Sequence, residues 1–204
     1  MVLDIASIHR KSTTKERILY AAAMMFAKNG YENVSVRDLA DEVNVRAPSL
    51  YNHFTSKKEI LHALYSAYNA EHMNAKPDID ELLRLVESEP PMKVLMRLYF
   101  FCDPDVEDLM SNIFVIASQM VSSDADSAAL VKSNLFDLSE ELWKPVLKKM
   151  IRLGKIEPID ADALSFLVTM YGFGGAALQT SNIEIDWGEW PKGYALLCSL
   201  VKTV

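Results

Sequence analysis

A pair of short helical patterns separated by a tight turn, between residues 34 and 61, constrains this fold most. The apolar residues of the first pattern recur at the spacing of an amphipathic helix, as Val36, Leu39, Ala40 and Val43. Ser35, with Asp38 three positions later, resembles a capping box: the serine can satisfy an N–H at the helix start, and the carboxylate suits the positive helix end. So short a turn between two helices predicts a helix-turn-helix.

Two residues with restricted backbones place the turn and the second helix. Asn44 tolerates the left-handed conformation that ends helices, so we expect the turn there. Pro48 suits a first helical position and disfavours the helical conformation at Ala47. The second helix is therefore expected to begin near Pro48 and to be about two turns long.

The helical period decides which side chains of the second helix face outward. Leu50 and Phe54 share one side and are expected to pack against the first helix. The opposite side and the flanks hold the candidate DNA contacts, with Pro48, Ser49 and Asn52 toward the bases and Tyr51 and His53 toward the sugar-phosphate walls. Asparagine, serine and a proline ring can all contact base edges in the major groove. Helix-turn-helix units also serve as ordinary packing motifs that do not bind DNA, and geometry alone leaves that alternative open.

Residues 15 to 68 resemble the DNA-binding region of the TetR family of bacterial one-component regulators. The matching segments, in the family's order and spacing, are residues 16 to 28, Gly30 with Tyr31, and residues 35 to 40, 50 to 54 and 57 to 61. The resemblance implies an all-α chain with a three-helix DNA-binding domain at residues 1 to 60 and a larger helical effector-binding and dimerisation domain at residues 61 to 204. The DNA contacts that it implies are Ser35, Arg37, Pro48, Ser49, Tyr51, Asn52, His53 and Lys57.

The chain departs from the family pattern at two positions near the turn. Asn44 stands where the family usually has glycine, and Arg46 where it often has serine or threonine. These departures bear on the turn geometry and on the cap of the second helix. Arg46 is either an additional phosphate contact or a solvated charge.

Net charge at first argues against a DNA partner, because −7 with a pI near 5.1 should repel phosphate. Residues 1 to 60, however, hold nine Lys/Arg and seven Asp/Glu, a balance of +2, so the remainder carries −9. Four basic residues gather before and within the first long helical pattern: Arg10, Lys11, Lys15 and Arg17. They form either a phosphate or minor-groove arm or a solvated helix start.

The rest of the chain predicts helices only, at about 78 to 88, 91 to 102, 104 to 122, 125 to 153, 160 to 180 and 188 to 203. Pro145 should kink or split the fifth of these, and Gly154 should end it. The resemblance implies that the last two helices pair with those of a second copy, giving a homodimer on a palindromic operator. A glycine-rich patch at residues 172 to 177 fits that interface or an internal core helix.

Large apolar side chains in the second part suggest a site for a small apolar or amphipathic effector, which the resemblance also implies. The candidate lining residues are Tyr65, Met96, Tyr99, Phe114, Trp143 and Met170. Methionines and aromatics at helical spacing also fill ordinary cores, so packing is the alternative for each. The helix that begins near Lys57 would connect the two domains and transmit a change at the effector site to the DNA-binding domain.

Several classes of function find no support in the sequence. No phosphate-binding glycine loop, HExxH or GxSxG motif is present, so no enzyme and no cofactor is expected. The histidines, at positions 9, 53, 62 and 72, have no metal-like spacing, and Cys102 and Cys198 are expected to be buried free thiols, a redox role being the alternative. With no long apolar run and no signal peptide, a cytoplasmic location is expected.

The sequence thus predicts a sequence-specific DNA-binding transcriptional regulator, a repressor released from its operator by an effector. The alternative is a TetR-fold protein that binds DNA but acts through a protein partner, in division or chromosome organisation, without an effector.

Overall fold

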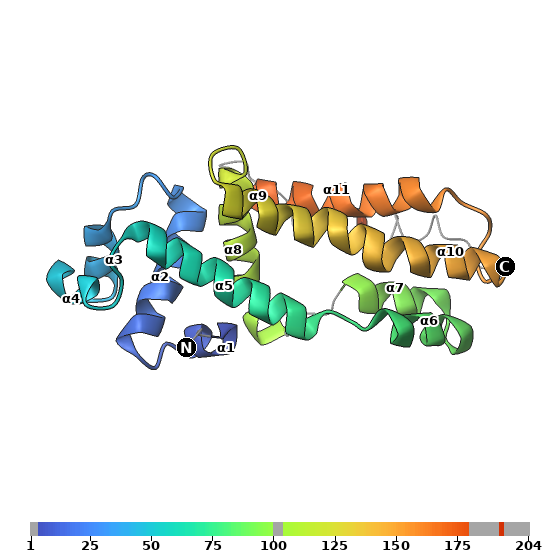
Figure 1. The fold of residues 1–204 in the computed structure, drawn as a ribbon, viewed down its shortest axis with the longest axis horizontal. Helices are drawn as coiled ribbons and strands as arrows, with labels where there is room; N and C mark the ends of the chain where they lie inside the picture. The colour runs from blue at the N-terminus through green and yellow to red at the C-terminus, as the bar shows by residue number, and fades with distance from the viewer. Residues whose placement is uncertain (1–3, 100–103, 180–191, 194–204) are drawn as a thin grey trace. The chain divides into compact units, whose positions relative to one another are not determined.

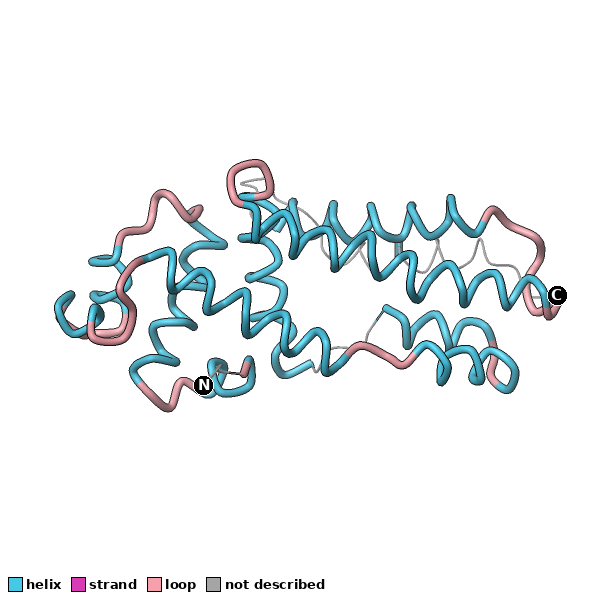
Figure 2. Tube along the Cα trace, in the orientation of Figure 1, coloured by secondary structure: helices cyan, strands magenta, loops and turns pink. Residues whose placement is uncertain are grey.

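The computed structural model describes residues 4–99, 104–179 and 192–193, and within them it contains helices and loops but no strand (Figures 1 and 2). The expected all-α class is confirmed. The chain divides into two compact units: unit 1 is Met1–Ala75 with Cys102–Val131, and unit 2 is Lys76–Phe101 with Lys132–Val204. The compact body that holds the helix-turn-helix is therefore larger than the 60 residues assigned to the DNA-binding domain.

Unit 1 contains the predicted helix-turn-helix and the long helix that follows it. Its elements are α1 (Ile5–Arg10), α2 (Thr14–Asn29), α3 (Val36–Glu42), α4 (Ala47–Tyr51), α5 (Lys57–Ala75), η1 (Pro104–Val106), α8 (Glu107–Met120) and most of α9 (Ala125–Lys132). A capping box between Thr13 and Glu16 starts α2, and Gly30, with φ +83°, ends it. Helix α2 packs against α8, α1, α3 and α5, so it is the central helix of unit 1.

Unit 2 is built around one apolar core. Its elements are α6 (Ile79–Ser88), α7 (Pro91–Tyr99), η2 (Ser133–Asp137), η3 (Ser139–Trp143), α10 (Lys144–Arg152) and α11 (Ala161–Gln179). The core brings together fully or almost fully buried side chains from α6, α7, η3, α10 and α11, among them Leu82, Val86, Leu95, Trp143, Leu147 and Leu164. The ranges expected for these helices agree with the structure within a few residues. The last expected helix, 188 to 203, lies outside the described residues except for 192–193.

Pro145 changes the hydrogen-bond pattern of the helix expected at 125 to 153. The segments before it, η2 and η3, have the wider π-helical spacing, and α-helical spacing returns in α10, where Pro145 is within the first two residues. Proline has no N–H to donate and its ring clashes with the carbonyl four residues earlier, so a regular α-helix cannot run through it. Gly154, with φ +64°, follows the end of α10 as expected.

In the part of the chain that the structure describes, no helix has both the length and the apolar character needed to cross a membrane.

Candidate nucleic-acid interface

The first helix of the helix-turn-helix, α3, begins with the capping box that the sequence suggested. The Asp38 N–H donates to Ser35 Oγ at 3.2 Å, and the Ser35 N–H donates to Asp38 Oδ2 at 2.7 Å. Hydrogen bonding from the side chain and the backbone N–H of Ser35 holds the pKa of the Asp38 carboxyl below its ordinary value. The cap fixes where α3 starts, and hence where the exposed side chains of Ser35 and Arg37 lie.

The turn after α3 keeps the geometry of a glycine turn although asparagine occupies it. Asn44 has φ +55°, in the left-handed region. The Val45 N–H donates to the Ala40 carbonyl at 2.9 Å, and the Asn44 N–H donates to the Asp41 carbonyl at 3.0 Å. This pair of bonds is a Schellman motif, which satisfies two carbonyls at a helix end. The departure from the family pattern at Asn44 therefore leaves the turn intact.

The second helix, α4, is shorter than expected and begins one residue earlier. It spans Ala47–Tyr51, with Arg46 at the N-cap position and no side-chain hydrogen bond capping it. The expected start near Pro48 is confirmed to within one residue, whereas the helix is shorter than the two turns expected. Asn52 follows the helix, but its φ of −70° and ψ of −18° continue the helical path, so its expected direction still holds.

Two buried anchors hold α4 against the rest of unit 1. Leu50 and Phe54 are each 1% exposed, as the helical period predicted. The Phe54 N–H donates to the Leu50 carbonyl at 3.1 Å, which keeps both anchors on one side after α4 has ended. Figure 1 shows α3, α4 and the start of α5 together at one end of unit 1.

Most of the predicted DNA contacts are accessible on this end of unit 1. Tyr51 is 52% exposed, which is high for an aromatic side chain. Ser49 and His53 are half-buried. The exposed members of the predicted set are Ser35, Arg37, Arg46, Pro48, Tyr51 and Asn52. A polar surface with one projecting aromatic, over apolar anchors, is physically suited to contact a groove and its walls.

Lys57 has a structural role that the sequence did not indicate. Its Nζ donates to the carbonyls of Tyr31 at 2.9 Å and Val34 at 3.1 Å, and it lies 4.1 Å from the centre of the Tyr31 ring. Lys57 thus ties the start of α5 to the loop before α3. An ammonium has three N–H donors, so one remains for a phosphate oxygen. Its partners lie 26 and 23 residues earlier, and no local pattern marks such a pairing.

The basic residues near the N-terminus do not form an extended arm. Residues 5–10 form α1, whose Ile5 and Ile8 are fully buried. Lys11 lies 3.9 Å from the centre of the Tyr20 ring, and Lys15 lies 5.2 Å from that of Phe54. Their charges lie along the surface of α1 and α2.

The candidate effector residues are divided between the two units. Tyr65 and Phe114 belong to unit 1, where Tyr65 is 4% exposed and shares a 2.8 Å hydrogen bond with Ser127. Met96, Trp143 and Met170 belong to unit 2; Trp143 is part of its core, and Met96 is 42% exposed. The side chain of Tyr99 lies outside the described residues. The lining set stays a prediction.

Comparison with known proteins connects this helix-turn-helix to a family. Residues 18–64 match the family model described as bacterial regulatory proteins, tetR family. An uncharacterized HTH-type transcriptional regulator of Bacillus subtilis, YerO, is 31% identical over 83 residues, which are 41% of this chain and 28% of YerO. The negative regulator IcaR of the Staphylococcus aureus biofilm operon icaADBC is 24% identical over 139 residues, 66% of this chain and 68% of IcaR.

Solved structures share the fold over nearly the whole chain. The Mycobacterium tuberculosis ketosteroid regulator KstR2 superposes with a TM-score of 0.62 at 18% identity, covering 95% of this chain and 97% of its own. A regulator from Saccharomonospora viridis, solved in complex with choline, gives a TM-score of 0.61 at 20% identity, covering 93% and 97%. At these identities the likeness concerns the fold, and the sequence match concerns the DNA-binding region. Residues 18–64 therefore match the tetR family of bacterial regulatory proteins, and the fold of nearly the whole chain is similar to that of these solved regulators.

Proposed function

We propose that this protein is a sequence-specific repressor of transcription that binds a palindromic operator in the cytoplasm as a homodimer. The observation that carries the proposal is the exposed end of unit 1, where a capped α3, a Schellman turn and two buried anchors hold α4 outward. The description of IcaR as a negative regulator supports repression over activation.

The contacts in this proposal divide by chemistry. Asn52 can donate to and accept from one adenine edge, and Arg37 can bond a guanine edge or a phosphate. Ser35, Arg46, Tyr51, His53 and the remaining donor of Lys57 contact the sugar-phosphate backbone, while Pro48 and Ser49 approach the bases. Base contacts specify the operator and phosphate contacts supply affinity that depends on salt.

An apolar strip on α11 supports the homodimer. Phe166 is 54% exposed and Leu167 is 49% exposed, although Leu164 and Val168 of the same helix are buried in the core of unit 2. Helix α11 therefore has apolar residues on both its inner and its outer side, a pattern typical of a helix that also packs against a second chain. A two-fold dimer presents two copies of α4 to successive major grooves.

The effector in this proposal is a small apolar or amphipathic molecule that binds within residues 61 to 204 and releases the operator. The relative solved in complex with choline supports the idea that such folds admit small ligands. Coupling requires the effector to favour an arrangement in which the two α4 helices no longer match the operator, with α5 as the connecting lever. Ordinary coupling is about 1 to 3 kcal/mol, or roughly 5- to 150-fold weaker operator binding.

A map of the chromosomal sites that the protein occupies in cells tests this function. A repressor is expected at a handful of palindromes near promoters. Occupancy of very many sites without promoter preference would instead favour the partner-dependent alternative, and an absence of sites would exclude DNA binding.

The same operator tests the dimer. Leu167→Glu places a charge on the outer side of α11 and is expected to give a monomer in analytical ultracentrifugation with much weaker operator binding. Phe136→Glu, at an apolar residue that is 46% exposed on η2, is the control that should leave the dimer intact. A Leu167→Glu variant that stays dimeric would remove α11 from the interface.

A further inference from the structure

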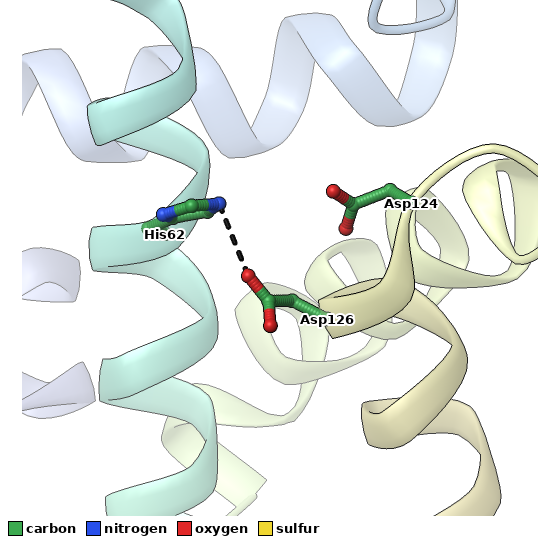
Figure 3. Close-up of side chains that lie close together, drawn as sticks. All are labelled: His62, Asp124 and Asp126. Carbon is green, nitrogen blue, oxygen red and sulfur yellow. Dashed lines mark ion pairs between the residues drawn. The ribbon is translucent and has the colours of Figure 1, made fainter.

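Three side chains with metal-ligating atoms meet within unit 1, away from the DNA-binding end (Figure 3). His62 lies on α5, Asp124 directly precedes α9, and Asp126 lies in the first turn of α9. One ligating atom from each lies within 4.8 Å of the other two, and His62 Nε2 is 3.2 Å from Asp126 Oδ2. Figure 3 shows the His62 ring and both carboxylates converging on one space between the two helices.

The His62 nitrogen that faces the carboxylates has an ion-pair partner but makes no hydrogen bond. Nε2 itself is buried from solvent and lies 3.2 Å from Asp126 Oδ2, whereas the His62 side chain as a whole is 42% exposed and that of Asp126 is 63% exposed. A desolvated ring nitrogen without a hydrogen bond costs free energy. A cation between the imidazole and the carboxylates would satisfy all three groups.

Asp124 is held in place by hydrogen bonds with Ser127 at the start of α9. Its Oδ2 accepts hydrogen bonds from the Ser127 hydroxyl at 2.7 Å and the Ser127 N–H at 2.9 Å, which caps α9. A carboxylate has about four acceptor positions, so the cap leaves room for a metal bond.

A second layer of contacts supports this arrangement. Ser127 is fully buried and shares its 2.8 Å hydrogen bond with Tyr65 Oη. Outer-layer hydrogen bonds of this kind orient metal ligands and raise affinity.

We propose that His62, Asp124 and Asp126 form a binding site for a first-row divalent transition-metal ion such as Zn²⁺ or Mn²⁺. An imidazole with two carboxylates suits these ions, whereas Mg²⁺ and Ca²⁺ prefer oxygen ligands alone. Tetrahedral ligands about 2.0 to 2.1 Å from the ion lie about 3.3 Å apart, close to the separation of His62 and Asp126. Water completes the coordination. The sequence missed this site because His62 and the two aspartates are about sixty positions apart.

Metal binding would tie α5 to α9. Helix α5 begins at Lys57, a few residues after α4, so a bound ion would stabilise the helix that carries the helix-turn-helix. Binding itself requires neither DNA nor effector, so the proposal can be tested without reference to the repressor function.

The test is titration of the metal-free full-length chain with ZnCl₂ and with MnCl₂ by isothermal calorimetry, together with thermal unfolding. Mn²⁺ is included because thiolates such as those of Cys102 and Cys198 bind it poorly. Three variants each remove one ligand: His62→Gln, Asp124→Asn and Asp126→Asn. Asparagine is as good a helix cap as aspartate, so Asp124→Asn keeps α9 capped while removing the charge. His9→Gln is the matched control, since His9 is exposed on α1 and distant in sequence.

We expect one ion per chain, a higher unfolding temperature with metal, and at least about 10-fold weaker binding in each ligand variant. His9→Gln should bind as the wild type does, and MgCl₂ and CaCl₂ should not compete. Two results would overturn the proposal: no binding of either ion below about 1 mM, or binding that His62→Gln and Asp126→Asn leave unchanged. The cluster would then be an ordinary ion pair beside a helix cap.

Discussion

The two units of this protein hold their helices in different ways. At the DNA-binding end of unit 1, short helices are fixed by caps, a Schellman turn and the contacts of Lys57 with backbone carbonyls. In unit 2, longer helices meet on one apolar core, and the polar contacts around it include exposed ion pairs such as Arg97 with Glu81. Directional bonds can fix the position of a side chain within a fraction of an ångström, whereas apolar burial supplies most of the stabilising free energy.

This difference suits two tasks. A surface that contacts bases needs a few side chains in defined places. The helices that carry them, α3 and α4, are too short to be stable alone. In the proposed function, unit 2 takes part in effector binding and dimerisation, which require a stable frame with adaptable apolar surface. If this comparison holds, directional polar contacts fix the side chains at the exposed end of unit 1, and apolar burial supplies most of the free energy that stabilises unit 2.

The largest effect is expected in the core of unit 2. Leu82 is fully buried, so Leu82→Ala should lower the free energy of unfolding by about 2 to 5 kcal/mol, measured by chemical denaturation. Arg97→Ala, which breaks the exposed pair with Glu81, should cost at most about 1 kcal/mol. If Arg97→Ala lowered the free energy of unfolding as much as Leu82→Ala does, polar contacts would contribute as much to the stability of unit 2 as apolar burial.

A smaller loss, confined to operator binding, is expected at Asn52. Its side chain is exposed, so Asn52→Ala should leave the unfolding free energy nearly unchanged. It should weaken operator binding by about 1 to 3 kcal/mol and relax base preference at one position in each half-site. Binding to a set of operators with single base changes measures both. An unchanged preference would show that Asn52 does not face the bases.

Lys57 and its neighbour Lys58 form a matched pair for the polar contacts of unit 1. Lys57→Met keeps the apolar stem but removes the ammonium from the carbonyls of Tyr31 and Val34. Hydrogen bonds to a charged group contribute about 1.5 to 3 kcal/mol, so unfolding should become easier by about that amount. Lys58→Met, at an exposed lysine one position later, should have little effect on stability.

The salt dependence of operator binding separates the two roles of Lys57. If its remaining donor contacts phosphate, Lys57→Met should weaken all sequences alike and lower the salt slope by about one. A full loss of stability with an unchanged slope would make Lys57 a purely structural residue.

Lys57 also illustrates which parts of the molecule were predictable. The cap at Ser35, the left-handed turn at Asn44 and the anchors Leu50 and Phe54 each depend on residues a few positions apart, and the structure confirms them. The start of α4 near Pro48 is also confirmed, to within one residue, whereas the predicted length of about two turns was wrong because the helix ends at Tyr51.

Contacts between distant segments could not be predicted. The partners of Lys57 lie more than twenty residues away, and Tyr65 meets Ser127 across 62 positions. Tyr65 stays a predicted lining residue of the effector site, and the buried hydrogen bond of its hydroxyl is a further contact that the sequence did not indicate. Hydrophobic periodicity identifies which side of a helix is buried, but it does not identify the neighbour.

The smallest effect is expected at the capping box of α3. Ser35→Ala removes the cap and should cost about 0.5 to 2 kcal/mol of stability at neutral pH.

The pH dependence of stability tests the other half of the capping box. The pKa of the Asp38 carboxyl is lower in the folded protein, so the stability that this carboxylate contributes is fully present above the unfolded pKa, near 3.8, and is lost as the pH falls through the folded pKa. The stability difference between wild type and Asp38→Asn should therefore be constant from pH 5 to pH 7 and should shrink in acid. Denaturation curves for both proteins across this range measure it. A difference that grew as the pH fell would mean that the carboxyl is held in its protonated form, and the capping box would not be the cause.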